Sequence, residues 1–282
     1  MIGKKLTVRD IIDMKSAADK IVVLTAYDAG FARFLDQNGV EIVLVGDSLG
    51  MVVLGYESTV PVTMEEMLHH SRAVKHGVER ALLVGDMPFL SYQVEVGSAI
   101  ANAGRFLKEA GCDAVKVEGG LEICATVAAM VRAGIPVMGH IGLTPQTAGA
   151  LGGYKVQGRD AESARRLLAE AKGLAEAGAF ALVLECIPDK LAAAITASVP
   201  IPTIGIGAGA QCDGQVLVIN DLLGMFEKFV PSFVKQYANL APQIAGAIVA
   251  FRDEVKGGVY PDAAHSFVMQ GEVEDLLKQG KG

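Results

Sequence analysis

Residues 42–47 read Ile42-Val43-Leu44-Val45-Gly46-Asp47, a short apolar run that ends in a carboxylate. Because the run is continuously apolar and rich in β-branched residues, it predicts a strand buried on both faces, as in parallel sheets. Three other runs end in charged residues in the same way: one at Asp86, one at Lys116 and Glu118, and one at Glu185. When parallel strands alternate with helices, their carboxyl ends converge on one mouth, so we expect these side chains to meet there.

Runs of this kind occur eight times along the chain, and most are separated by segments of helix length. They are Ile21 to Thr25, Ile42 to Gly46, Ala81 to Gly85, Ala114 to Val117, Pro136 to Gly139, Ala179 to Leu184, Pro202 to Ile206, and Gln215 to Ile219. Eightfold alternation of strand and helix predicts an α/β fold, the (β/α)8 or TIM barrel. An open doubly wound sheet is the alternative, because the eighth run has the weakest strand pattern.

Two segments fall outside this repeat. Residues Thr7 to Ala18 predict an extra N-terminal helix that could cover the barrel floor. Residues Pro231 to Val255 supply the last helical sequence. No linker or low-complexity segment interrupts the chain, so we expect residues 1–282 to form a single barrel domain with a frayed tail over residues 270–282.

The composition argues against several classes of function. A net charge of −7 at pH 7 disfavours nucleic-acid binding, which requires clustered Lys and Arg. No segment has the uninterrupted apolar character of a membrane span, and the charged sequence after residues 1–5 predicts no signal peptide. Cysteines without close pairing are typical of free thiols in a reducing compartment. We therefore expect a soluble, cytoplasmic protein that acts on a small molecule.

Three acids at the predicted mouth have the character of a cation site. Asp47 and Asp86 follow different strands, and Glu118, on a third, can bind a cation directly or hold a metal-bound water. Ligation by oxygen alone favours Mg²⁺ or a similar hard cation over zinc. Because Mg²⁺ keeps several waters, a small substrate such as a 2-oxo acid can replace them and chelate it. The alternative is that Asp47 and Asp86 each cap the helix that follows.

Other polar side chains at the strand ends suit substrate binding and proton transfer. Lys116 and Glu118 are two residues apart on one strand, so they point the same way and can form an internal ion pair. The lysine can also bind a substrate carboxylate, to which Ser48 can donate a hydrogen bond. His140 is expected to face the mouth as a donor. Glu185 lies among apolar residues, which suits a general base, although it can instead pair with a basic residue at the rim.

The segment from Ile141 to Arg159 is long, mostly uncharged and rich in Gly and Thr. Long loops over a barrel mouth are usually functional. We interpret this loop as either a lid or a contact between subunits.

Several motifs extend this pattern over most of the chain. They are Thr25-Ala26-Tyr27-Asp28, residues 44–51 (which contain Gly46-Asp47-Ser48), Val115-Lys116-Val117-Glu118-Gly119-Gly120, Gly139-His140-Ile141-Gly142-Leu143-Thr144-Pro145-Gln146, Gly153-Tyr154-Lys155-Val156-Gln157-Gly158, Leu184-Glu185-Cys186, residues 204–209, Gly258-Val259-Tyr260-Pro261 and His265-Ser266-Phe267. Taken together, from about Leu6 to Phe267, the chain resembles the ketopantoate hydroxymethyltransferase family. Only the last dozen or so residues extend beyond this resemblance.

The resemblance implies transfer of a hydroxymethyl group from 5,10-methylenetetrahydrofolate to 3-methyl-2-oxobutanoate, which gives 2-dehydropantoate in pantothenate synthesis. By position, it implies that Asp47, Asp86 and Glu118 hold Mg²⁺. It also implies that Asp47, Ser48, Asp86 and Lys116 bind the oxo acid, and that Glu185 is the proton acceptor. The family is similar in fold to barrels that act on phosphoenolpyruvate and pyruvate, and it typically forms a homodecamer of two pentamers.

Two other functions fit the same strand ends. A carbon–carbon lyase or aldolase of the same barrel group would use a metal and an enolate without folate. A barrel that only binds a metal-carboxylate ligand, as a sensor, would need no base such as Glu185. No local motif indicates which residues would bind the pterin of a folate.

Overall fold

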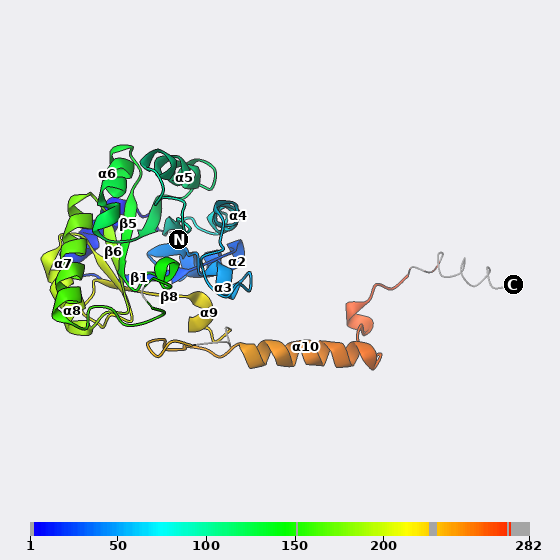
Figure 1. Cartoon of the computed structure of the whole chain (residues 1–282). Coiled ribbons are helices and arrows are strands. Elements are labelled where there is room, and N and C mark those ends of the chain that lie inside the picture. The colour runs from blue at the N-terminus through cyan, green and yellow to red at the C-terminus, as the bar shows by residue number, and fades with distance from the viewer. Residues whose placement is uncertain (1–2, 151, 226–229, 270, 272–282) are drawn as a thin grey trace.

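The computed structural model describes residues 3–269, except 151 and 226–229, together with Gly271. Eight parallel strands form a closed barrel, in which each strand pairs with its sequence neighbours and β8 pairs with β1 (Figure 1). The strands are β1 Ile21–Thr25, β2 Ile42–Val45, β3 Leu82–Asp86, β4 Ala114–Glu118, β5 Val137–Gly142, β6 Ala181–Glu185, β7 Thr203–Ile206 and β8 Gly214–Leu217. The predicted barrel is confirmed, and the open sheet is wrong because the edges close.

Most of the strands are followed by helices, as the alternation predicted. The helices are α1 Val8–Ala17, α2 Ala29–Gln37, α3 Leu49–Val52, α4 Met64–Lys75, α5 Val96–Lys108, α6 Cys124–Arg132, α7 Ala161–Glu176, α8 Asp189–Ser198, α9 Ile219–Leu222 and α10 Ala241–Lys256, and three short 3₁₀ turns are Leu121–Ile123, Pro145–Thr147 and Ala263–His265. The sequence did not predict the four-residue helices α3 and α9, and the end of its eighth run is the start of α9. Both short helices follow strands at the barrel mouth.

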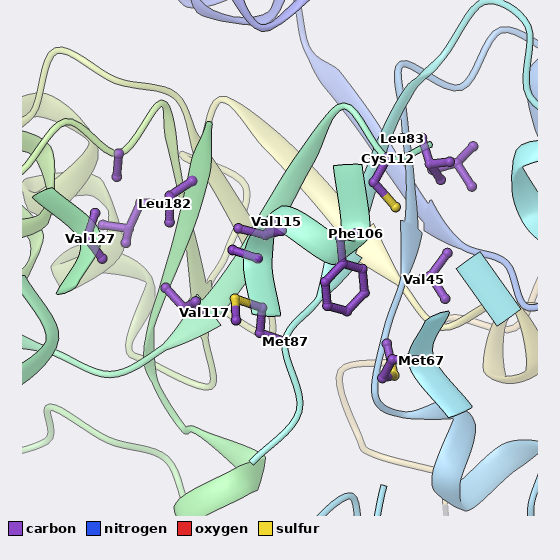
Figure 2. Close-up of a cluster of buried hydrophobic side chains, with 14 of the residues drawn as sticks. Val45, Met67, Leu83, Met87, Phe106, Cys112, Val115, Val117, Val127 and Leu182 are labelled. Atoms are coloured by element: carbon purple, nitrogen blue, oxygen red, sulfur yellow. The ribbon is translucent and has the colours of Figure 1, made fainter. Parts of the chain in front are cut away.

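Buried apolar side chains form two layers, one inside the barrel and one between the strands and the helices. Alternate side chains point inward and fill the barrel. The others pack outward against the helices, and part of this outer layer is shown in Figure 2. In the outer layer, the ring of Phe106 on α5 lies directly over Gly85 of β3, where a Cβ atom would collide with it. This close approach fixes α5 against the strand that ends in Asp86, and so helps to fix the position of that carboxylate.

Helix α1 closes the floor of the barrel, as predicted. Thr7 and Asp10 form a capping box at its start. Its apolar side inserts Ile11, which is fully buried among the inward-facing strand residues. On the same helix, Lys15 Nζ lies 2.7 Å from an oxygen of Asp213, just before β8.

The C-terminal part of the chain departs from the barrel. Helix α10 leads away from it (Figure 1), and no residue of α10 is buried. The sequence predicted helix from Pro231 onward, but α10 begins only at Ala241. The predicted frayed tail, residues 270–282, lies outside the described residues apart from Gly271. Among the described helices, none is long and apolar enough to cross a membrane.

Candidate active site

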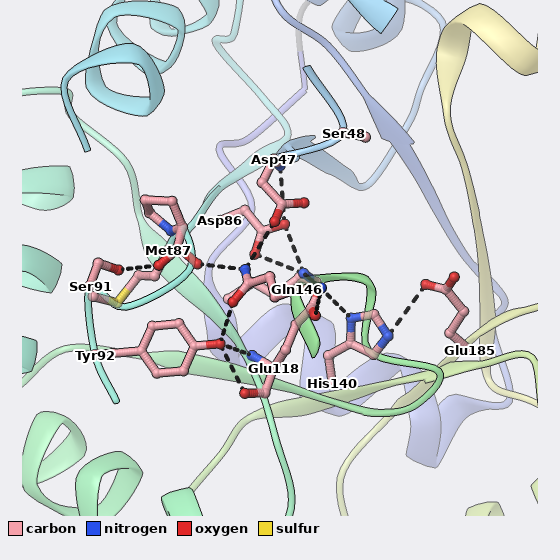
Figure 3. Close-up of polar contacts among 12 residues, drawn as sticks. Asp47, Ser48, Asp86, Met87, Ser91, Tyr92, Glu118, His140, Gln146 and Glu185 are labelled. Carbon is pink, nitrogen blue, oxygen red and sulfur yellow. Dashed lines mark hydrogen bonds and ion pairs between the residues drawn. The ribbon is translucent and has the colours of Figure 1, made fainter. Parts of the chain in front are cut away.

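The charged strand ends predicted from the sequence meet at the carboxyl-terminal mouth of the barrel (Figure 3). The register of the parallel strands places Asp86 of β3 beside Lys116 of β4, and Glu118 of β4 beside His140 of β5. Glu185 ends β6, beside Gly142 of β5. Because the sheet is closed, side chains that are far apart in the sequence face one another across the mouth.

Asp47, Asp86 and Glu118 form a compact, buried set of carboxylates. One oxygen atom from each lies within 4.8 Å of the others. All three donors are hard oxygens, so the set fits Mg²⁺ and does not suit zinc. The capping alternative is wrong for both aspartates. Helix α4 is capped by Thr63 instead, and no side-chain bond caps α3 or α5.

Lys116 is the cation shared by these acids. Its Nζ donates hydrogen bonds of 2.7 Å to each oxygen of Asp86 and lies 3.3 Å from Oε1 of Glu118. The predicted ion pair between Lys116 and Glu118 is thus present, but the shorter contacts are to Asp86. Burial opposes the charge on the lysine, and the neighbouring Asp86 and Glu118 outweigh it and raise the pKa of Lys116.

The charges at the mouth are unevenly compensated. Burial, together with the charges of Asp86 and Glu118, raises the pKa of Asp47 well above its ordinary range. For Glu118, burial acts in the same direction, but Lys116 and His140 outweigh it and lower its pKa to about 2. Glu118 is therefore ionised at neutral pH, whereas Asp47 carries the unrelieved repulsion of the set. A divalent cation between the three carboxylates would remove this repulsion.

His140 links the acidic set to Glu185. Its Nδ1 lies 3.5 Å from Oε1 of Glu118, and its Nε2 lies 3.3 Å from Oε2 of Glu185. Burial opposes protonation, but Glu118 outweighs it and raises the pKa of His140 to about 9. The ring therefore carries a positive charge between the two glutamates at neutral pH. As predicted, His140 faces the mouth as a potential donor, and the group beside Glu185 is this buried histidine rather than an arginine or lysine.

Gln146 and Tyr92 hold the acids in place, and neither was predicted to do so. Gln146, in the turn after β5, donates from Nε2 to Oδ2 of Asp47 at 2.9 Å, and its backbone N–H donates to Oε2 of Glu118 at 3.1 Å. The hydroxyl of Tyr92 donates to Oε1 of Gln146 at 2.8 Å. Pro145 at the start of a turn was the available signal for Gln146, but only the fold shows that the turn bends into the mouth.

Ser48 lies beside Asp47, where its hydroxyl is 2.8 Å from the hydroxyl of Tyr27. Both are on the strand ends next to the acidic set, because Tyr27 follows β1 and Ser48 follows β2. The contact holds the Ser48 hydroxyl at the wall of the cavity described next.

A cavity of about 360 Å³ occupies the mouth, within the usual range for a small-molecule site of roughly 300–1,000 Å³. One side is the acidic set, and the other is mostly apolar. The apolar side includes Val183, Ile206, Val216, Val218, Pro231 and Phe233. Tyr154, Lys155 and Val156 of the long loop also line the cavity, so this loop covers the mouth.

The long loop starts close to Glu185 because of Gly142. This glycine has φ of 97°, and a Cβ atom there would run into the backbone of Glu185. The next residue, Leu143, donates its backbone N–H to the carbonyl of Glu185 at 2.9 Å. Gly142 therefore sets the position of Glu185 relative to the loop.

Comparison with known proteins places this site in a family. The sequence model of the ketopantoate hydroxymethyltransferase family matches residues 5–263. A 3-methyl-2-oxobutanoate hydroxymethyltransferase of Desulfotalea psychrophila is 60% identical over 271 residues, which cover 96% of this chain and 97% of the relative. One of Carboxydothermus hydrogenoformans is 60% identical over 273 residues, which cover 97% of this chain and 99% of the relative.

Solved structures with much lower identity share the barrel. A phosphoenolpyruvate phosphomutase from Streptomyces platensis subsp. rosaceus aligns with a TM-score of 0.59 at 16% identity, over 98% of this chain and 96% of that one. A 2,3-dimethylmalate lyase of the PEP mutase/isocitrate lyase superfamily aligns with a TM-score of 0.57 at 13% identity, over 98% and 99% of the two chains. The predicted likeness in fold to the phosphoenolpyruvate and pyruvate barrels is confirmed.

Proposed function

The chain belongs to the ketopantoate hydroxymethyltransferase family, and we propose that it transfers a hydroxymethyl group from 5,10-methylenetetrahydrofolate to 3-methyl-2-oxobutanoate, a step of pantothenate biosynthesis. The product is 2-dehydropantoate. The observation that supports this most strongly is the position of Glu185 across His140 from three clustered carboxylates (Figure 3). A cation site that can stabilise a developing enolate and a separate proton acceptor together suit the breaking of a C–H bond next to a carbonyl.

Asp47, Asp86 and Glu118 would hold Mg²⁺ in this proposal. When bound, the ion would act as a Lewis acid and stabilise the negative charge that develops on the oxo acid. The pKa of Asp47, raised by burial and by the charges of Asp86 and Glu118, supports this assignment. Among the described residues, the cations in contact with the set are Lys116 and protonated His140. Gln146 holds Asp47 in position for the ion.

Asp47, Ser48, Asp86 and Lys116 would surround the oxo acid. Lys116 is buried and positively charged, so it favours an anionic substrate, and the hydroxyl of Ser48 at the cavity wall can donate a hydrogen bond to a carboxylate. The two aspartates would contact the substrate through the cation they share. The apolar side of the cavity suits the branched methyl groups of the acid.

Glu185 would remove the proton from C3 of the oxo acid. The electron pair of that C–H bond then forms the new carbon–carbon bond to the one-carbon unit, whose two bonds to the folate nitrogens break. Water supplies the hydroxyl oxygen, and tetrahydrofolate leaves after its two nitrogens take up the C3 proton and one proton from the water. Nε2 of His140 lies 3.3 Å from Oε2 of Glu185, and this contact can hold the carboxylate in position for the proton transfer. Cys186, the next residue, has φ of 48°, and this left-handed turn ends β6 directly after Glu185.

A turnover assay tests the proposal. Purified protein is incubated with 3-methyl-2-oxobutanoate, Mg²⁺ and 5,10-methylenetetrahydrofolate, and 2-dehydropantoate is measured by mass spectrometry. We expect product only when both the metal and the folate are present. Cleavage of a 2-oxo acid or its adduct without folate would instead support the lyase or aldolase alternative.

We also propose that the chain forms a homodecamer of two pentamers, and α10 supports assembly with other copies. Ile244, Ile248, Phe251 and Val255 lie at helical spacing along one face, and each is between 43% and 63% exposed. No described helix lies between β7 and β8, and Val22 on the outer side of β1 is 47% exposed. An α10 helix from a neighbouring copy could cover this uncovered part of the barrel wall.

Light scattering tests the assembly. The double change Ile248→Asp and Phe251→Asp should lower the mass of the particle, because it places charges on the apolar face. Ala250→Asp, on another side of the same helix, is the matched control and should leave the mass unchanged. A wild-type protein that is monomeric at micromolar concentration would contradict the proposal.

We place the enzyme in the cytoplasm. All four cysteines are free thiols, which suits a reducing compartment. The sequence predicted buried thiols; this is confirmed for Cys112 and Cys212 and is wrong for Cys124 and Cys186, which are partly exposed. Detection of the activity in a soluble cell fraction, and not in culture medium or membranes, is the corresponding measurement.

A further inference from the structure

Asp221 is a buried carboxylate at the mouth that belongs to neither the acidic set nor the Glu185–His140 pair. It lies on α9, directly after β8, and is 9% exposed. Asp221 lines the cavity. Its side chain makes no hydrogen bond and no ion pair with any residue that the structure describes. Burial raises the pKa of this carboxyl to about 6. A buried carboxylate without a partner destabilises the fold, so a ligand is the natural partner to look for.

The backbone holds Asp221 firmly at this place. The N–H of Ile219 donates to Oγ1 of Thr25 on β1 at 3.0 Å, which ties the start of α9 to the barrel. The N–H of Asp221 itself donates to the carbonyl of Val218 at 3.1 Å. The side chain is therefore presented to the cavity by a short, well-anchored turn.

Asp221 shares the cavity with the oxo-acid site. Burial raises the pKa of Tyr27, and the charges of Asp221 and Asp47 act in the same direction. The same tyrosine contacts Ser48. Val216 of β8 and Val218, which directly precedes α9, also line the cavity and give it an apolar wall on the side of β8.

A cavity of about 360 Å³ is larger than a five-carbon oxo acid requires, and the reaction needs a second reactant in the same space. The pyrimidinone half of a reduced pterin is flat, and its 2-amino group and N3–H are two parallel donors on one edge. A carboxylate accepts such a pair in the bidentate arrangement that it uses with arginine. The other carboxylates that line the cavity are engaged with Lys116, Gln146 or His140.

We infer that Asp221 binds the 2-amino and N3–H edge of the tetrahydropterin ring of the one-carbon donor, with the apolar wall of β8 against the ring. This inference rests on the proposed function, because it names the part of the same cavity that takes the folate. It makes Asp221 a determinant of affinity for the donor and leaves metal and oxo-acid binding to the residues of β2, β3 and β4.

Substitutions at Asp221 test this assignment by calorimetry with tetrahydrofolate as the probe. Asp221→Ala and Asp221→Asn should each weaken tetrahydrofolate binding roughly 10- to 100-fold, the usual cost of a lost charge-assisted pair. Binding of 3-methyl-2-oxobutanoate with Mg²⁺ should change less than about threefold in both variants, because those contacts are made elsewhere. Asp19→Asn, an exposed position before β1 on the floor side, makes the same change in net charge and is the matched control.

A second probe separates edge recognition from a general loss of the pocket. A 2-deamino tetrahydropterin lacks the amino donor, so wild-type protein should bind it at least about tenfold more weakly than the parent tetrahydropterin. In Asp221→Ala this difference should disappear. Equal tetrahydrofolate affinity in wild type and Asp221→Ala, an undiminished difference in the variant, or parallel loss of oxo-acid binding would each overturn the inference. Product formation by wild type without folate would instead overturn the proposed function, and it is seen in a different assay.

Discussion

The two ends of the barrel treat buried and partly buried carboxylates in opposite ways. At the floor, each is satisfied by the protein itself. Asp36 accepts backbone N–H groups of Arg80 and Ala81 at 3.0 and 2.7 Å. Asp113 accepts from Lys5 at 2.6 Å and from a backbone N–H at 2.8 Å. Asp213 is bound in the same way by Lys15 and by the backbone of β7.

At the mouth, the protein does not supply enough partners. Asp47, Asp86 and Glu118 share one lysine, and the pKa of Asp47 is raised by burial and by its acidic neighbours. Asp221 has no partner among the described residues. The comparison indicates that a carboxylate with a structural role receives its hydrogen bonds and positive charge from the protein. A carboxylate that binds a ligand lacks some of these partners until the ligand supplies them.

Removal of the acidic set should have the largest effect on activity. Asp47→Ala combined with Asp86→Ala removes two of the three proposed oxygen ligands, so kcat/KM should fall about 10⁴-fold or more. Calorimetry should show no Mg²⁺-dependent binding of the oxo acid. Titration curves identical to those of wild type would take both residues out of the metal site.

Glu185→Gln should separate binding from proton transfer. The amide keeps the shape of the side chain but cannot accept a proton, so exchange of the C3 hydrogen of the oxo acid in deuterated solvent should slow about 10³-fold. Exchange is followed by NMR in the absence of folate. Binding of the oxo acid with Mg²⁺ should remain within a few fold of wild type. Undiminished exchange would assign the base to another residue.

The fold was largely predictable because its signals are local. Each strand is a short apolar run, and glycines such as Gly111, Gly134 and Gly178 have the positive φ expected where a helix ends before a strand. The departures concern segments whose local pattern is ambiguous. Helix α9 continues from an apolar run, and residues 231–240 are not helical although they follow a helix-like composition.

Only those site residues that lie at the ends of strands could be predicted from the sequence. Asp47, Asp86, Lys116, Glu118 and Glu185 all reach the mouth because strand ends in a parallel barrel converge there. Side chains that reach the mouth from elsewhere could not be placed in this way. Gln146 comes from a turn and Asp221 from a four-residue helix, so their contacts depend on tertiary geometry that no spacing in the sequence encodes.

At the floor, loss of a carboxylate should affect stability and not catalysis. Asp36→Ala leaves the backbone N–H groups of Glu79, Arg80 and Ala81 without their acceptor in a buried place, so the free energy of unfolding should fall by about 3 kcal/mol. Urea denaturation measures this loss. Activity per folded molecule should stay within about twofold of wild type, since the mouth is at the opposite end. A large drop in kcat with unchanged stability would contradict the division between the two ends.

The smallest expected effect is the pH dependence of stability that Asp221 causes. It tests directly whether this carboxylate at the mouth lacks a partner in the folded protein. Its ordinary pKa of 3.8 rises to about 6 in the folded protein, so the folded state holds the proton more tightly than the unfolded state does. Below pH 4 the carboxyl is protonated and does not lower the free energy of unfolding. As the pH rises through 6 the buried group ionises, and the free energy of unfolding declines. Asp221→Asn removes this decline.

Relative to wild type, the Asn variant should therefore gain about 1–2 kcal/mol at pH 8, after allowance for screening at the open cavity, and nothing at pH 4. Urea denaturation of both proteins at the two pH values gives this difference, and Asp19→Asn should show the same difference from wild type at both. Saturating tetrahydrofolate should reverse the order at pH 8, because the wild-type carboxylate then has its partner. A gain that is equal at pH 4 and pH 8 would mean that the Asp221 carboxylate is not the source of the cost.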